Sequence, residues 1–488
     1  MIEMMLRIFK TFGFLLALTC ILVHAAGAAA ELPRPVTQAL KAAGIPASSV
    51  GAVVQEVGAS KPTLSHEARD SMNPASVMKL VTTYSALELL GPAYHWKTEV
   101  YVDGNDVVLK GYGDPKLNYE SFWMLLRSLR GRGLRDIRGD LVLDRSWFGA
   151  VADGRIDDDS FRPYNVTPDA LLVNFKSLRF TFLPADSAVK VFAEPALPGL
   201  EIVNSLKLAE GGCPEGKAFR SLLQADFQSK PPRASFTGAY PLVCGEKELN
   251  VALYEPQEYV AAMVKQLWAE MGGTWAGVVR QGTASPTAQL VYVHESEPLA
   301  EIVRDINKFS NNVMARQLYL TLAAEMGGPP ARPELALVAI RQLLTTRGIK
   351  APELVMENGS GLSRQERASA ATIAAVLAAA WRSPVMPEFV ASLPVVAADG
   401  TMKKRLLGAG VAGHAHIKTG LLQDVRSIAG YVLDRHGRRY LVVMIINHPR
   451  ASAEGEQALN AMLEWVYDGP RARAAATARP PSGGPRNP

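Results

Sequence analysis

The chain reads Asn-Pro-Ala-Ser-Val-Met-Lys-Leu at residues 73–80, and an apolar run typical of a helix follows at residues 81–90. The asparagine and proline are common helix start signals, so Ser76 is expected to open the helix with Lys79 on the same face. An amine placed there can reach the serine hydroxyl, and burial beside a second cation would lower its pKa enough to make it a general base. On its own, this short motif indicates a helix start with a solvated lysine more often than a catalytic pair.

Two later motifs change that interpretation. Residues 310–312 read Ser-Asn-Asn between two helical patterns, and residues 418–420 read Lys-Thr-Gly just before a strand-like run. Ser-x-x-Lys, Ser-x-Asn and Lys-Thr-Gly, in this chain order, form the motif set of penicillin-binding proteins and serine β-lactamases. Each motif is weak alone, but the three together predict a site for acyl transfer to a serine.

The composition is that of a globular protein with more than one domain. Of the 488 residues, 48% are hydrophobic and 20% are charged, which provides an ample core and excludes a disordered chain or a polytopic membrane protein. Residues 1–30 are typical of a signal peptide, because positive charge precedes a short apolar stretch and small residues precede Glu31. Cys20 follows the wrong residue type for lipoprotein processing. A soluble protein exported to the periplasm is therefore expected.

The net charge of +5 lies outside the body of the chain. The leader contributes one positive charge and residues 469–488 contribute four, so residues 31–468 are neutral overall. This balance excludes a basic nucleic-acid-binding protein. The tail, residues 469–488, is rich in Ala, Pro, Gly and Arg and is predicted to be disordered. Its composition suits weak association with anionic lipid or cell-wall polymer, and equally an uncommitted solvated end.

Two cysteines remain after removal of the leader, Cys213 and Cys244. An exported protein meets an oxidising environment, so a disulfide is expected in preference to two free thiols. No histidine lies between them, and a zinc site is not indicated. The sequence predicts neither a metal site nor a cofactor.

The order of helix and strand patterns predicts an interrupted domain. Residues 31–95 and 285–468 alternate helices and strands, and one sheet with strands from both chain ends, flanked by helices, accounts for them. Residues 96–284 read mostly as strands with Gly and Pro turns, and form an inserted region. The expected fold class is a multidomain α/β (α+β) protein.

The chain resembles the low-molecular-mass class C penicillin-binding proteins, a family of D-alanyl-D-alanine carboxypeptidases and endopeptidases, over residues 32–468. Beyond the three motifs, the resemblance rests on the long insert after Ser76 and on four segments: Gly113–Pro115, Gly139–Asp144, Asn358–Arg364 and Ala398–Thr401. It implies a transpeptidase-like fold of the penicillin-binding protein and serine β-lactamase type. In that fold an antiparallel sheet lies between helix layers, and two small β-rich domains would be inserted here.

The resemblance also implies a role for each residue of the first two motifs. Ser76 would attack a D-Ala-D-Ala bond and form an acyl-enzyme, and Lys79 would take its proton. Ser310 would pass a proton to the leaving amine, while Asn312 would orient Lys79 and the substrate amide. Asn311 is expected to be free to vary.

The third motif is implied to bind the substrate. Lys418 would favour a neutral Lys79 and, with Thr419 and Gly420, hold the terminal carboxylate of the substrate. The backbone N–H groups of Ser76 and Leu421 would form the oxyanion hole.

Two further residues are candidates for substrate specificity. A diaminopimelate side chain ends in an amine and a carboxylate, which Asp153 and Arg364 would pair with, respectively. Both charges are equally explained as ordinary surface or loop-fixing groups. Peptidoglycan stem peptides and β-lactam inhibitors are the expected ligands.

Two other functions remain open at this point. A β-lactamase or esterase on the same fold would need a base for the deacylating water, and the Glu-x-x-x-Asn pattern of class A β-lactamases is not found. A non-catalytic peptidoglycan-binding protein would be expected to lack a catalytic side chain, and none is missing. The sequence leaves open whether the protein forms a homodimer and which of the two peptidase activities dominates.

Overall fold

The computed structural model describes residues 31–151, 161–185 and 187–470. The predicted signal peptide, all but two residues of the basic tail, and Asp153 lie outside the described residues. Within those ranges, no helix is long and apolar enough to cross a membrane.

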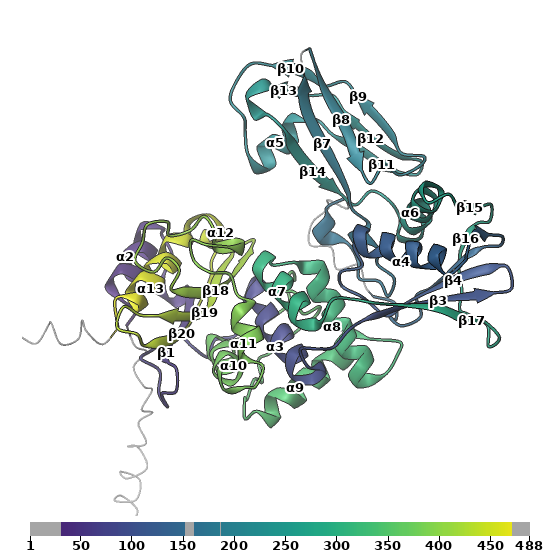
Figure 1. The fold of residues 1–488 in the computed structure, drawn as a ribbon. Helices are drawn as coiled ribbons and strands as arrows, with labels where there is room; N and C mark the ends of the chain where they lie inside the picture. Colours follow the sequence, from purple (N-terminus) through teal and green to yellow (C-terminus); the bar gives the residue numbers. More distant parts are fainter. Residues whose placement is uncertain (1–30, 152–160, 186, 471–488) are drawn as a thin grey trace, which may run out of the picture.

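A five-stranded antiparallel sheet forms the centre of the first domain, and its strands come from both ends of the chain, as predicted (Figure 1). The order is β18-β19-β20-β1-β2, with bounds β18 Ala415–Leu422, β19 Val425–Leu433, β20 Arg439–Asn447, β1 Val50–Glu56 and β2 Leu64–His66. Alternate residues of β20 enter separate cores, with Val443 and Ile445 on one face and Val442 and Met444 on the other. This alternation is the reason that the sheet lies between two helix layers.

Helices cover both faces of the sheet. On one face lie α2 (Arg34–Ala42), α12 (Ala451–Glu454) and α13 (Glu456–Tyr467). On the other lie α3 (Lys79–Leu90), α7 (Leu299–Phe309), α8 (Asn312–Gly327), α9 (Pro333–Thr346), α10 (Ala370–Arg382) and α11 (Met386–Ala391). Because residues 79–87 of α3 are all buried, this helix is a central element of the domain rather than an amphipathic surface helix.

The inserted region contains a second five-stranded sheet beside two helices. Its order is β16-β6-β4-β3-β17, with bounds β16 Val279–Gln281, β6 Leu141–Asp144, β4 Asp106–Gly111, β3 Lys97–Asp103 and β17 Gln289–Glu295. Close to it are α4 (Tyr119–Gly131), α6 (Pro256–Glu270) and the pair β5 (Asp136–Ile137) and β15 (Thr274–Trp275). Since β17 pairs with β3, residues 289–295 belong to this sheet and not, as predicted from the sequence, to the domain of the three motifs.

A further group of strands forms a separate body beyond α6 (Figure 1). Its first sheet has the order β14 (Lys247–Val251), β7 (Leu178–Ala185), β8 (Ala188–Glu194). Its second sheet has the order β11 (Asp226–Ser229), β12 (Pro232–Phe236), β9 (Glu201–Asn204). The pair β10 (Lys207–Ala209) and β13 (Ala239–Pro241) and the helix α5 (Gly216–Leu222) complete the body. The predicted fold class, an antiparallel sheet between helices with β-rich insertions, is confirmed.

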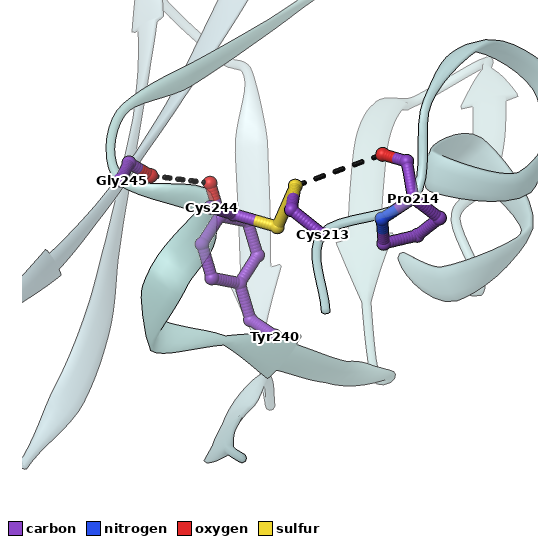
Figure 2. The surroundings of a disulfide bond; sticks show 5 residues. All are labelled: Cys213, Pro214, Tyr240, Cys244 and Gly245. Carbon is purple, nitrogen blue, oxygen red and sulfur yellow. Dashed lines mark hydrogen bonds between the residues drawn. A yellow bond between two sulfur atoms is a disulfide. The ribbon is translucent and has the colours of Figure 1, made fainter. Parts of the chain in front are cut away.

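The predicted disulfide is present in this β-rich body. Cys213 and Cys244 are bonded with their Cα atoms 4.9 Å apart (Figure 2). The bond ties the segment before α5 to the turn between β13 and β14, where the Tyr240 hydroxyl donates to the Gly245 carbonyl at 2.8 Å.

Candidate active site

Ser76 lies in a short 3-10 turn, Ala75–Met78, that leads directly into α3. The sequence predicted a regular α-helix that opens at Ser76, but Ala75 adopts a positive φ of 46° and the α-helix begins at Lys79. Long-range contacts hold this tighter turn. Asn73 is bonded through its backbone to the Asn447 side chain and through its own amide to the Ser363 carbonyl.

Lys79 is fully buried, and its side-chain nitrogen donates three hydrogen bonds. The nitrogen donates to Ser76 Oγ at 3.0 Å, to Asn312 Oδ1 at 2.6 Å and to the Ser360 carbonyl at 2.5 Å. Burial lowers the pKa of Lys79 to about 7, although the negative charge of Glu366 acts in the opposite direction. A neutral amine beside the Ser76 hydroxyl is therefore accessible near neutral pH, and it can accept the hydroxyl proton.

The junction between α7 and α8 carries the second motif. Ser310 ends α7 in the left-handed conformation, with φ 57° and ψ 38°, and α8 begins at Asn312. Asn311, which was expected to be free to vary, caps α8, because its Oδ1 accepts from the Met314 N–H at 3.0 Å. The side chain of Asn311 thus stabilises the helix that carries Asn312.

Lys418 lies within β18, whereas the sequence predicted a strand that begins just after the third motif. It is fully buried, and its nitrogen donates to Ser310 Oγ at 2.8 Å and to the Thr419 carbonyl at 2.8 Å. Burial lowers the pKa of Lys418 well below its usual value, and the positive charge of Lys79 lowers it further. Two lysines that share one buried site titrate as a pair, so one proton is lost from the pair before the other.

The rest of the third motif lies against the Ser76 turn. The Thr419 hydroxyl is 2.9 Å from that of Thr401, in one of the segments that carry the family resemblance. A Cβ on Gly420 would lie 2.7 Å from the Pro74 carbonyl and 2.2 Å from Ser427 Oγ, so only glycine allows β18 to approach so closely. Leu421, the next residue of β18, has an exposed side chain.

One buried residue beside the site was not singled out from the sequence. Glu366 is fully buried and interacts electrostatically with Lys79. Its position two residues after the glycine-rich segment Asn358–Arg364 was the available signal, but an acidic residue in a loop is normally solvated.

A cleft of about 980 Å³ opens from the α7–α8 junction toward the β-rich insert. Ser310 and Asn312 line it at one end. The other walls come from the start of α4 and from the strands β7, β8 and β14, and contain aromatic and charged side chains, among them Tyr119, Phe192, Arg179, Glu194 and Glu248.

Of the two candidate specificity residues, Arg364 and Asp153, the structure describes only Arg364. Arg364 is exposed on the loop that leads to Glu366, and its guanidinium donates to Gln423 Oε1 at 2.9 Å. Asp153 lies outside the described residues, so its relation to the site stays a prediction.

Comparison with known proteins identifies a family for almost the whole chain. Residues 34–467 match the model of the D-Ala-D-Ala carboxypeptidase 3 (S13) family. The D-alanyl-D-alanine carboxypeptidase of Actinomadura sp. (strain R39) is 28% identical over 86% of this chain and 81% of its own length. The D-alanyl-D-alanine carboxypeptidase DacB of Haemophilus influenzae is 24% identical over 82% of this chain and 85% of its own.

Solved structures share the fold. The crystal structure of penicillin binding protein 4 (dacB) from Haemophilus influenzae superposes with a TM-score of 0.73 at 21% identity, and covers 88% of this chain and 99% of that chain. The same protein complexed with a novel β-lactam superposes with a TM-score of 0.70, with the same coverage.

Proposed function

The chain belongs to the D-Ala-D-Ala carboxypeptidase 3 (S13) family, and from that premise we propose that Ser76 is the nucleophile of a serine D-Ala-D-Ala carboxypeptidase acting on peptidoglycan stem peptides. The observation that carries the proposal is the position of the buried Lys79 nitrogen, 3.0 Å from Ser76 Oγ and 2.6 Å from Asn312 Oδ1. A serine hydroxyl needs such a base to attack an amide.

Acylation proceeds in two proton transfers. Lys79, in its neutral form, takes the Ser76 proton as Oγ attacks the carbonyl carbon of the penultimate D-Ala. The C–N bond then breaks, the terminal D-Ala leaves as an amine that receives a proton through Ser310, and the penultimate residue stays as an ester on Ser76. Ser310 is suited to this step because Lys418 donates to its hydroxyl at 2.8 Å.

The third motif binds the substrate terminus. Lys418 and Thr419 attract the terminal carboxylate, and the backbone N–H groups of Ser76 and Leu421 stabilise the oxyanion. Loss of one such oxyanion donor typically costs about 10²–10³ in rate. Water then hydrolyses the ester, with Lys79 or Ser310 assisting.

The same site supports endopeptidase activity. A D-Ala–diaminopimelate cross-link places a second stem peptide on the leaving side, and the cleft of about 980 Å³ beside Ser310 and Asn312 has room for it. Such a substrate requires the protein to be exported to the periplasm, in agreement with the leader-like residues 1–30.

The test is a mass spectrum of the intact protein after incubation with penicillin. The expected result is one adduct per chain, mapped by peptide digestion to Ser76. The variant Ser76→Ala should fold normally, as judged by circular dichroism, but take up no label, because the change removes only a hydroxyl. An adduct on a different serine, or none, would refute the assignment.

A further inference from the structure

Glu366 is a fully buried carboxylate at the centre of the loop that touches Lys79. Four backbone N–H groups of one short segment point at it. Oε1 accepts from residues 357, 358 and 359 at 3.1, 2.9 and 2.9 Å, and Oε2 accepts from Gly361 at 2.8 Å. Backbone N–H groups converging on both oxygens favour the ionised form over a protonated one.

The loop wrapped around this carboxylate supplies a ligand to the site. The Ser360 carbonyl accepts from Lys79 at 2.5 Å, and the neighbouring Gly359 carbonyl accepts from the Thr82 hydroxyl at 2.7 Å. Gly361 lies so close to the Ser76 turn that a Cβ would be 1.9 Å from the Ala75 carbonyl. The orientation of these carbonyls therefore depends on how Glu366 folds the loop.

Glu366 is coupled to titratable groups on three elements. Its charge acts on Lys79 of α3, Lys79 acts in turn on Lys418 of β18, and burial and the Glu366 charge both raise the pKa of Tyr319 on α8. Burial raises the pKa of Glu366 itself, and the backbone N–H groups act against that rise. The buried cluster thus holds two amines and one carboxylate, so a single retained lysine proton makes its net charge zero.

We propose that Glu366 is a positioning residue that keeps one proton on the buried pair formed by Lys79 and Lys418. With that proton retained, one lysine is free to act as a base while the other stays a cation for the substrate carboxylate. This inference rests on the proposed roles of Ser76 and Lys79.

The decisive variant is Glu366→Gln, measured as the second-order rate of penicillin acylation against pH. The acylation rate rises as the lysine pair loses its first proton and falls as it loses the second, so its pH profile is bell-shaped, with an acidic and a basic limb. Removal of the negative charge makes both protons easier to lose, so both limbs should move toward acid by about one pH unit. An unshifted bell with a lower rate at every pH would mean that Glu366 only supports the loop.

Two matched variants separate charge from shape. Glu357→Gln removes a carboxylate from the same loop, where Glu357 is exposed and accepts from the Ser363 hydroxyl, so it should leave the limbs in place. Glu366→Asp keeps the charge but shortens the side chain, so it should lower the rate while the limbs stay within about half a unit of those of the parent protein. A one-unit shift in either variant would contradict the proposal.

If Glu366→Gln does not fold, the electrostatic interaction between Glu366 and Lys79 is measured by replacing the lysine instead. In Lys79→Met the carboxylate loses its partner, so its proton affinity should rise, and protein labelled with ¹³C-glutamate should gain one protonated glutamate in the infrared spectrum at neutral pH. No gain would overturn the proposal. The two proposals fail separately. A parent protein that penicillin does not acylate refutes the function, whereas an active protein whose pH profile is unchanged in Glu366→Gln refutes only the role of Glu366.

Discussion

Arg364 and Arg367 lie on the loop that leads to and from Glu366, but they contact different groups. Arg364 donates to the Gln423 side chain at 2.9 Å, whereas Arg367 donates to the backbone carbonyls of Arg364 and Glu366 at 2.7 and 2.9 Å. A guanidinium bonded to a neutral amide can exchange that partner for a carboxylate, with which it forms a stronger, charge-assisted pair. Arg364 therefore stays the candidate for substrate recognition, whereas Arg367 holds the loop.

Replacing Arg364 by Ala is expected to lower kcat/KM about tenfold for a peptide that carries a diaminopimelate terminus, and hardly at all for one with a truncated side chain. Steady-state release of D-Ala from the two peptides measures the difference. Arg367→Ala is the control, and should affect both peptides alike. Equal losses for both peptides in Arg364→Ala would show that this arginine also acts only on the loop.

At the level of elements, α8 depends on its cap to present Asn312. The N-terminal N–H groups of a helix have no partner within it, and Asn311 Oδ1 satisfies that of Met314. Asn311→Ala should reduce the free energy of unfolding by about 1 kcal/mol, measured by urea denaturation, whereas Asn311→Ser should retain most of it. Acylation by penicillin should stay within about threefold of the parent rate, because the side chain faces the backbone of α8. A loss as large as that of an Asn312→Ala variant would mean that Asn311 acts in the chemistry.

The disulfide is expected to stabilise the β-rich body of the insert. It closes a loop with a sequence separation of 31 residues, and a loop of that length corresponds to about 3–4 kcal/mol in the chain-entropy model. The double variant Cys213→Ser/Cys244→Ser should therefore unfold this body at lower urea concentration. Ser76 acylation should be unchanged, because both cysteines belong to the core of the insert and not to that of the catalytic domain. A parallel loss of acylation would show that the insert supports the site.

For the whole molecule, the fate of the acyl-enzyme separates a peptidase from a β-lactamase. A D-alanyl ester has lost its leaving group, so water can enter the vacated space, whereas a penicilloyl ester keeps its leaving group attached. Glu366, the carboxylate that interacts with Lys79, already uses both oxygens to accept backbone N–H groups. It is therefore unsuited to activating a water molecule.

Peptide turnover should accordingly be fast and penicillin turnover slow, with the penicilloyl adduct persisting for many minutes. The measurement mixes the protein with excess D-Ala-D-Ala peptide and, separately, with excess penicillin, and follows D-Ala release and β-lactam hydrolysis. Rapid and sustained penicillin hydrolysis with little D-Ala release would favour the β-lactamase interpretation.

The sequence by itself determined the candidate chemistry and the origin of the central sheet in both ends of the chain. Three short motifs identify the candidate residues of the site, because each motif contains chemically suited side chains at a fixed local spacing. The order of helix and strand patterns predicted a sheet built from both chain ends, and the continuous apolar run of residues 440–446 suits a strand that is buried on both faces.

Only the tertiary structure decided how those pieces fit. Ser76 lies in a 3-10 turn because Asn447 and Ser363, far away in the sequence, hold Asn73. Residues 289–295 join the sheet of the insert because β3 offers them an edge, and Glu366 is buried because its own loop folds around it. A strand edge depends on a partner that is distant in sequence, and the burial of Glu366 depends on the conformation of its loop against α3, so no pattern of residue types reveals either.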